Sequence, residues 1–288
     1  MSLDPVLLED IINRSLREDI GTGDITTLSI VSENHATTGF IRAKEPGVVA
    51  GLDVAREVFL QLCPDISYQA RVKDGERLVA GQLLAKVEGD ARAILTGERV
   101  ALNFLQRLSG IATRTAYLAG LIAGEKAKLV DTRKTTPGLR VLEKYAVRVG
   151  GGQNHRFGLY DAVLIKDNHI KVAGGITGAI ARARTLAPFC MGVEVEVESL
   201  EGVEEAIRAG ANIIMLDNMD LAAMRKAVEQ VGGRALLEAS GGINEETIQA
   251  VAKTGVDFIS VGSLTHSVKS MDISLDAGEV KPIPGVNI

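Results

Sequence analysis

The 288-residue sequence has no tryptophan, only 3% aromatic residues and no excess of basic over acidic side chains. Its 32 Lys and Arg residues against 37 Asp and Glu residues give a net charge of −5 at pH 7. Proteins that bind nucleic acid in general carry a basic surface that neutralises phosphates, and single-strand binders add aromatic platforms for the bases. The composition therefore predicts no nucleic-acid partner.

Long apolar runs are also missing, and cysteine is scarce. No stretch stays apolar over the roughly 20 residues that a membrane-spanning helix requires. The first residues lack the basic-then-apolar layout of a signal peptide. The two cysteines, Cys63 and Cys190, are isolated and have no metal-ligand spacing. Because isolated cysteines suit a reducing compartment, we expect a cytoplasmic protein. The lack of long apolar runs predicts that it has no membrane partner.

The N-terminal part of the chain combines a helix with short strands. Asp4 and Pro5 suit the N-cap and first turn of an opening helix. Alternating stretches such as 38–43 and 83–87, separated by glycine-containing turns, then indicate strands. Residues 96–123 have the apolar content of a helix pair.

Residues 72–84 are similar to the turns of biotinyl and lipoyl carrier domains. Those domains present a modifiable lysine at a hairpin tip, and nothing in this stretch supplies one. A structural turn module is the favoured interpretation, and a carrier module is kept as a rival from another functional class.

The C-terminal part alternates short apolar runs with amphipathic helical segments, such as 200–209, 221–231 and 247–254. This alternation predicts a parallel sheet. Nearly every run ends in a polar residue or glycine, as the ends of barrel strands do where they build an active site. A doubly wound sheet needs this only near its switch point. The segment is shorter than a full barrel of eight units, so we expect an α/β fold with a small or incomplete barrel. The strand-end residues are Asp131, Lys166, Glu196, Asp217, Ser240 and Gly262.

Residues 131–170 carry a local charge of +3, from seven cations and four anions, in a chain of net charge −5. Such a run is usually a solvated face. Here, however, cations directly follow two apolar strands, and residues 150–156 form a glycine-rich loop between them. Because a cation is costly to bury without a partner, these side chains predict a polyanionic ligand. The cations are Arg133, Lys134, Arg140, Lys144, Arg148, Arg156 and Lys166.

Two further groups of residues define the candidate site. The glycine-containing ends of the late strands, at 240–244 and 261–263, are typical of phosphate loops in barrels. Asn244 is expected to cap the helix that follows the first of them. The strand-end carboxylates Glu196 and Asp217 suit Mg²⁺, general acid–base chemistry, ribose contacts or salt bridges to the cations. Glu194 and Glu198 alternate with Glu196 on the same strand face, and only the resemblance described below favours Glu196 over them. His155 is as consistent with structural hydrogen bonding as with a functional role.

At these positions the chain resembles the quinolinate phosphoribosyltransferases. The most specific matching stretches are residues 131–140, 150–159 and 164–169, and the likeness runs from about residue 95 to 265. The resemblance implies an N-terminal α/β sandwich (residues 1–110) and an incomplete (β/α) TIM-like barrel of about seven strands (111–270). It also implies a C-terminal extension (271–288) that packs back on the first domain.

The resemblance also implies the reaction. Quinolinate and phosphoribosyl pyrophosphate (PRPP), with Mg²⁺, would give nicotinate mononucleotide, pyrophosphate and CO₂ for NAD synthesis. The family pattern is a homodimer with shared active sites, in which Arg99 reaches the neighbouring subunit. Assembly beyond the dimer is left open.

By the same resemblance, the catalytic residues are Lys134, Glu196 and Asp217. The two carboxylates would serve the metal directly or through substrate and water. The substrate-binding set is Arg99, Thr132, Arg133, Lys134, His155, Arg156, Lys166, Glu196, Asp217, Ser240, Gly241, Gly242, Gly262 and Ser263. Two rivals are related enzymes: a paralogous phosphoribosyltransferase with another anionic acceptor, and a barrel enzyme of the thiamin-phosphate synthase type.

Overall fold

The computed structural model describes residues 3–278 and 281–282, which form two compact units. The first unit takes in the described residues up to Arg114, then Thr136–Gly150, then those from Val268 on. The second comprises Thr115–Thr135 and Gly151–Ser267. The sequence analysis places its boundaries at 110/111 and 270/271 and does not indicate that residues 136–150 return to the first unit.

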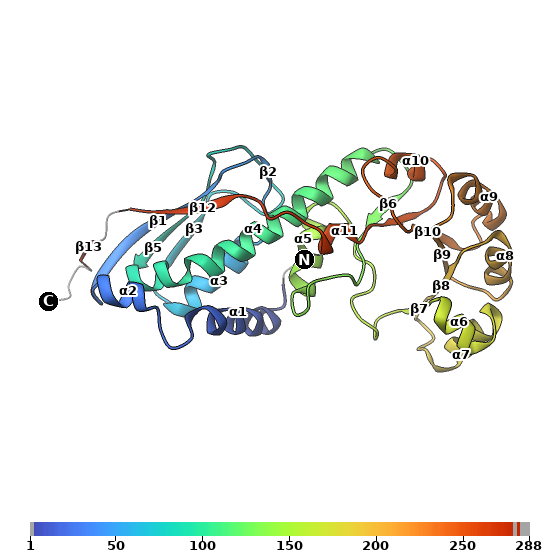
Figure 1. Cartoon of the computed structure of the whole chain (residues 1–288), viewed down its shortest axis with the longest axis horizontal. Helices are drawn as coiled ribbons and strands as arrows, with labels where there is room; N and C mark the ends of the chain where they lie inside the picture. The colour runs from blue at the N-terminus through green and yellow to red at the C-terminus, as the bar shows by residue number, and fades with distance from the viewer. Residues whose placement is uncertain (1–2, 279–280, 283–288) are drawn as a thin grey trace. The chain divides into compact units, whose positions relative to one another are not determined.

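A five-stranded antiparallel sheet forms the centre of the first unit (Figure 1). Its order is β12–β1–β5–β3, with β13 also paired to β1. Along β1 the side chains alternate between buried and half-buried, as they do in a strand with one covered face. The strands are β1 (His35–Ala43), β3 (Ser67–Ala70), β5 (Leu83–Asp90), β12 (Ile273–Ala277) and β13 (Lys281–Pro282), beside a small ladder of β2 (Gly47–Val48) and β4 (Arg77–Leu78).

Helices α1, α3 and α4 lie on one face of this sheet, so the unit is an α/β sandwich (Figure 1). The predicted opening helix is confirmed: the Asp4 side chain accepts a hydrogen bond from the Val6 N–H at 2.9 Å, and Gly21 caps the other end. Helices α2 and α3 were not expected from the strand-like texture of their region. The helices are α1 (Pro5–Ile20), α2 (Ile25–Ile30), α3 (Leu52–Leu62), α4 (Ala91–Leu121, whose last turns belong to the second unit) and α5 (Arg140–Val149).

The helix pair predicted for residues 96–123 is wrong, because α4 is one continuous helix. Gly110 lies in its middle without interrupting it. A Cβ atom there would overlap the backbone carbonyl of Lys269. This glycine therefore permits close packing of another segment against the helix, and it does not mark a turn.

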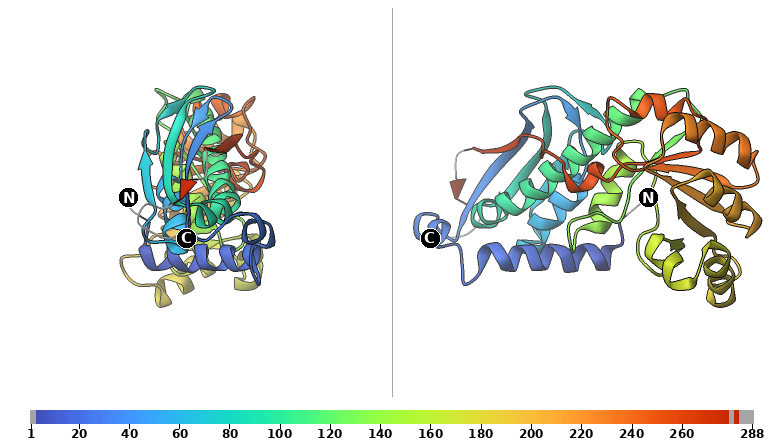
Figure 2. Two further views of the ribbon diagram at one scale, coloured as in Figure 1. Left: turned by 90° about the vertical axis from the view of Figure 1, so that its left-hand side faces the viewer. Right: turned by 45° about the vertical axis from the view of Figure 1, so that its right-hand side comes forward.

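The second unit is built on a parallel six-stranded sheet in the order β6–β11–β10–β9–β8–β7. Helices lie outside these strands, as the right-hand view of Figure 2 shows. The strands are β6 (Lys128–Val130), β7 (Val163–Ile165), β8 (Val193–Val197), β9 (Ile213–Asp217), β10 (Leu236–Ser240) and β11 (Phe258–Ser260). The helices are α6 (Asp167–Ala173), α7 (Ile176–Leu186), α8 (Leu200–Arg208), α9 (Leu221–Val231), α10 (Ile248–Ala252) and α11 (Ser263–His266).

This strand order confirms the incomplete barrel. From β7 to β11, consecutive strands of the chain are neighbours in the sheet, and β11 has β6 as its other neighbour. This is the strand order of a ring. Within the described chain, β6 and β7 do not pair with each other, so the ring stays open. Gln153 bridges to Val130 at the open edge of β6. The sheet has six strands, against the roughly seven expected from the resemblance.

The apolar runs explain these strands. All five residues of β8 are buried, including Glu194 and Glu196, and β9 and β10 have buried centres. Strands covered on both faces are expected to be apolar throughout. An acidic residue in such a strand therefore indicates a polar interior near that point.

None of the described helices is long and apolar enough to cross a membrane.

Candidate active site

A cavity of about 830 Å³ opens where the strands of the second unit end. Parallel strands bring their carboxyl ends to one rim, and residues from all six strand ends line this cavity. Every predicted site residue except Arg99 is among the lining residues. Arg99 belongs to the first unit, where it is exposed on α4.

Arg133 and Lys134 follow β6 on a segment that is held by hydrogen bonds. The Lys134 N–H donates to the Thr132 hydroxyl at 3.0 Å. The buried Thr265 hydroxyl donates to the Lys134 carbonyl at 2.8 Å. The Lys134 side chain itself is exposed. The backbone is thus fixed while the ammonium group stays available to a ligand.

Asp131, which directly follows β6 and is fully buried, organises the glycine-rich loop. Its carboxylate accepts hydrogen bonds from the Asn154 side chain at 2.6 Å and from the His155 backbone N–H at 2.8 Å. The next residue, Arg156, donates from Nη1 to the Ala162 carbonyl at 3.1 Å. Asp131 thereby places His155 and Arg156 beside the cavity.

Arg156 sits in an environment that favours an anion. Burial, followed by the positive charge of Arg133, lowers the pKa of the Arg156 guanidinium from its usual value. Two cations close together in a partly desolvated place repel each other, and a bound carboxylate or phosphate would relieve that repulsion.

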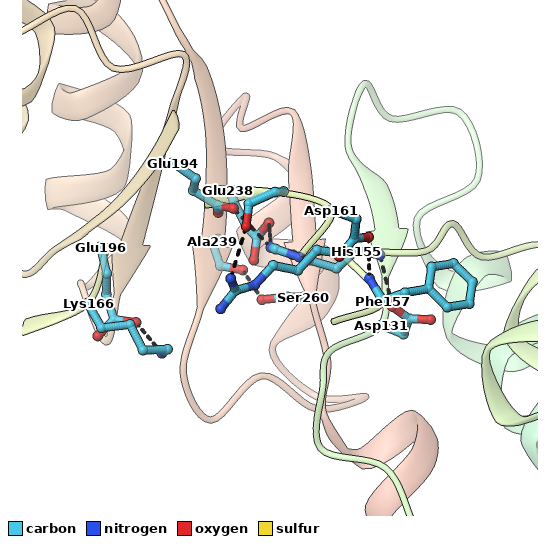
Figure 3. Close-up of polar contacts among 12 residues, drawn as sticks. Asp131, His155, Phe157, Asp161, Lys166, Glu194, Glu196, Glu238, Ala239 and Ser260 are labelled. Carbon is cyan, nitrogen blue, oxygen red and sulfur yellow. Dashed lines mark hydrogen bonds and ion pairs between the residues drawn. The ribbon is translucent and has the colours of Figure 1, made fainter. Parts of the chain in front are cut away.

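Lys166 and two carboxylates form the opposite wall. Lys166 follows β7, and its Nζ lies 2.6 Å from Oε2 of Glu196 on β8 (Figure 3). Asp217 ends β9, and its carboxylate accepts from the Asn218 side chain at 2.9 Å. Burial raises the pKa of Asp217 and the charge of Glu196 raises it further, whereas Lys166 lowers it. An acidic pair of this kind favours a further cation or a hydroxyl-rich ligand.

The late strands end in two glycine-containing loops at the same cavity. Gly241 and Gly242 have φ angles of 98° and 62°, which favour glycine. A Cβ atom at Gly241 would also overlap the side chain of Asn218. Both positions therefore favour glycine, and at Gly241 the Asn218 side chain also excludes anything larger. The backbone at this edge of the cavity is thus not covered by side chains of its own, which suits a phosphate.

One detail of the predicted phosphate loops is wrong. Asn244 was expected to cap a helix, but Thr247 occupies the N-cap of α10 and Asn244 forms a turn before it. The Asn244 side chain accepts from the Glu246 and Thr247 N–H groups at 3.0 and 3.2 Å. Helices α10 and α11 have five and four residues. Their dipoles are correspondingly weak, so phosphate binding would depend on the loop N–H groups.

The cavity also contains polar residues that were not predicted from the sequence as part of the site. They are Asn218, Glu238, Ser260 and His266, besides Asn244 of the predicted phosphate loop. Glu238 carried an available signal, since it lies two residues before Ser240 and so shares its strand face. Glu194, which the sequence could not separate from Glu196, is buried beside Glu238.

Comparison with known proteins identifies the family. Residues 24–109 match the family model described as the N-terminal domain of quinolinate phosphoribosyl transferase, and residues 111–276 match that of its C-terminal domain. The chain belongs to the quinolinate phosphoribosyl transferase family.

Relatives of this family are similar over almost the whole chain. A probable nicotinate-nucleotide pyrophosphorylase [carboxylating] of Bacillus subtilis is 48% identical over 93% of both chains. The nicotinate-nucleotide pyrophosphorylase [carboxylating] of Mycobacterium leprae is 46% identical over 93% of this chain and 96% of that protein. The crystal structure of NadC from Streptococcus pyogenes has a TM-score of 0.93 at 46% identity, covering 98% of this chain and 99% of that one.

Proposed function

We propose that this member of the quinolinate phosphoribosyl transferase family transfers a phosphoribosyl group from PRPP to quinolinate. Decarboxylation then gives nicotinate mononucleotide, pyrophosphate and CO₂ for NAD synthesis. The observation that carries the proposal is one cavity with four cations, an acidic pair and two glycine loops. The names of relatives at 46–48% identity support the same reaction.

The cations would bind the acceptor, quinolinate. Quinolinate is a dianion, and PRPP carries more negative charge still, so the two repel each other in water. Arg133 and Arg156 offer planar donors suited to carboxylates, and Lys166 offers a compact charge. Binding here would hold both anions together, which is catalysis by positioning and electrostatics.

The glycine loops and the acidic pair would bind the donor, PRPP. The N–H groups of Gly241, Gly242 and Gly262 would receive the 5′-phosphate, with the hydroxyls of Ser240 and Ser263 beside them. Glu196 and Asp217 would accept hydrogen bonds from the ribose hydroxyls, and the Lys134 ammonium group would bind the pyrophosphate.

The same acidic pair fits Mg²⁺, because hard divalent cations prefer carboxylate oxygens and substrate oxygens. Burial, followed by the charge of Glu196, raises the pKa of Asp217, and a bound cation would favour the ionised form of this carboxylate. When bound with PRPP, Mg²⁺ would supply charge stabilisation to the departing pyrophosphate.

The chemistry needs no nucleophile from the protein. As the bond between ribose C1 and the pyrophosphate oxygen breaks, positive charge develops at C1, and Glu196 and Asp217 would stabilise it. The quinolinate nitrogen then forms the new bond to C1. The cationic ring accepts the electron pair released when the C2 carboxylate leaves as CO₂, and C2 takes up a proton. We therefore expect no covalent enzyme intermediate.

The remaining predicted residue, Arg99, would act from the neighbouring subunit of a homodimer. Its exposure on α4 agrees with a role outside its own unit. A cytoplasmic location remains a prediction from the isolated Cys63 and Cys190, which form no disulfide.

Mixing two inactive variants tests the shared site. Arg99→Ala and Lys134→Ala should each abolish activity but recover about a quarter of the wild-type rate after subunit exchange, since half of the dimers are mixed and each has one complete site. A mixture of Arg133→Ala and Lys134→Ala is the matched control, because both changes damage the same chain's cavity. Equal rates in the two mixtures, with exchange verified by mass spectrometry, would contradict the shared site.

Release of CO₂ tests the reaction itself. Carboxyl-labelled quinolinate should give labelled CO₂ and nicotinate mononucleotide only when PRPP and Mg²⁺ are both present. Nicotinate should not replace quinolinate, because it lacks the carboxylate that leaves. A folded dimer that releases no CO₂ would refute the proposal and point to a different anionic acceptor.

A further inference from the structure

A histidine and two buried glutamates form a cluster beside the cations of the cavity. His155 Nε2 lies 3.0 Å from Oε2 of Glu194 on β8 and 3.5 Å from Oε2 of Glu238 on β10. Figure 3 shows the two glutamates next to each other, with the Lys166–Glu196 pair set apart from them. Both glutamates are more than nine-tenths buried, at 4% and 3% exposure. The proposed mechanism uses neither of them.

The hydrogen bonds decide the tautomer of His155. The Arg156 backbone N–H donates to His155 Nδ1 at 2.7 Å, so Nδ1 carries a lone pair. The hydrogen of the neutral ring is then on Nε2, which donates to Glu194. Both ring nitrogens are therefore committed within the protein. A metal ion at Nε2 would require the hydrogen on Nδ1, where it would oppose the Arg156 N–H.

Both carboxylates lie against the same imidazole nitrogen, and their closeness to each other raises a charge problem. Two ionised glutamates this close repel each other, and burial penalises both charges. Burial, followed by the charge of Glu194, raises the pKa of Glu238 to about 7. The groups that oppose this shift are His155, the Ser260 hydroxyl on β11 and Lys166 after β7.

We propose that Glu238 is a positioning residue which, with Glu194, holds His155 in its Nε2–H tautomer and thereby fixes Arg156. The imidazole acts on Arg156 through the hydrogen bond to its backbone, and the guanidinium is directed to the acceptor. This inference rests on the proposed function, because it assigns Arg156 to the acceptor.

The protonation of Glu238 has a consequence for anion binding. Below pH 7 the protonated side chain adds no charge to the cavity wall. Above pH 7 it adds a negative charge close to the cations, which weakens their attraction for an anion. Affinity for the dianionic acceptor should therefore fall as the pH rises through about 7, the value given by the pKa of Glu238. Glu238→Gln, which stays neutral, should remove this fall.

Nitrogen-15 NMR of labelled histidines tests the positioning without any substrate. The chain has 4 histidines, so His155→Gln assigns the relevant ring. We expect an Nε2–H signal pattern whose shifts move with a midpoint near pH 7, the pKa of Glu238, and lose that movement in Glu238→Gln. An Nδ1–H pattern, or the same movement in Glu238→Gln, would overturn the proposal. This readout is valid even when the proposed reaction fails.

Kinetics give the second readout. We expect Glu238→Ala to raise the quinolinate KM about tenfold, as loss of one oriented contact does, with the PRPP KM unchanged. The isosteric Glu238→Gln variant should have the wild-type quinolinate KM at pH 6. Its KM should rise less than that of the wild type as the pH increases to 8. Glu229→Gln, exposed on α9, is the matched control and should follow the wild type. If quinolinate is turned over and Glu238→Gln keeps the wild-type pH profile, the positioning role is wrong while the proposed function stands.

Discussion

Replacing Lys166 with alanine should lower kcat/KM by about a hundred- to a thousandfold, the loss seen when one preorganised charge opposite a reacting group is removed. Lys166 Nζ lies 2.6 Å from Glu196 Oε2, and its charge also lowers the pKa of Asp217. Without it, the two carboxylates lose their nearest cation where two anionic substrates must bind. With both carboxylates ionised, the net charge of Lys166, Glu196 and Asp217 would change from −1 to −2, which repels the anionic substrates more strongly. Steady-state kinetics with both substrates varied would measure the loss.

Two variants separate this effect from a general loss of charge. Lys171→Ala removes an exposed lysine one helical turn further along, where it pairs with Asp167 at 2.9 Å, and should leave the kinetics unchanged. Lys166→Arg keeps the charge but not the compact ammonium, and should be intermediate. A Lys166→Ala enzyme with less than about a tenfold loss would show that the Glu196 pair is structural.

Replacing Glu143 with alanine should have the largest effect on stability, about 3–5 kcal/mol, the range for breaking a buried ion pair. Glu143 is fully buried on α5. It accepts from Arg107 Nε on α4 at 2.8 Å and from the Thr136 N–H at 3.1 Å. The substitution removes the carboxylate that holds three parts of the first unit together. Native-state hydrogen exchange of the α5 amides would report the loss locally.

The control for Glu143 is an ion pair at the surface of the same unit. Glu33 is 82% exposed and lies 3.3 Å from Arg92. Exposed pairs contribute little because water screens them, so Glu33→Ala should leave the exchange rates unchanged. Glu143→Gln keeps the shape and one acceptor oxygen and should fall between the two. Similar exchange in Glu143→Ala and Glu33→Ala would contradict the importance of the buried pair.

The parallel sheet and the location of its site could be predicted because both depend on local pattern. Apolar runs that end in polar residues mark strands and their carboxyl ends, and parallel strands bring those ends together. Asp131 and Asp217 were found in this way, whereas Glu196 was chosen over its neighbours on the same strand face through the family resemblance. The helix of residues 221–231 was likewise predicted from its periodicity and is confirmed as α9.

What the sequence did not disclose depends on contacts between distant residues. The alternation of side chains along β10 places Glu238 on the same face as Ser240. It does not indicate that Glu194 and His155 lie next to Glu238 in the folded chain. The commitment of both His155 nitrogens likewise depends on the loop that Asp131 holds. The continuity of α4 through Gly110 depends on a backbone segment far along the chain. Local propensity contains none of these facts.

The open edge between β6 and β7 divides the cavity into two parts with different freedom to change. Arg133 and Lys166 follow the two end strands, each of which has one side without a strand partner in the described sheet. The glycine loops follow β10 and β11, which are paired on both sides. We therefore expect the segments after the two end strands to accept insertions and substitutions more readily than the loops after β10 and β11. A lineage built on this fold can therefore acquire a new acceptor while its means of holding a sugar phosphate is inherited intact.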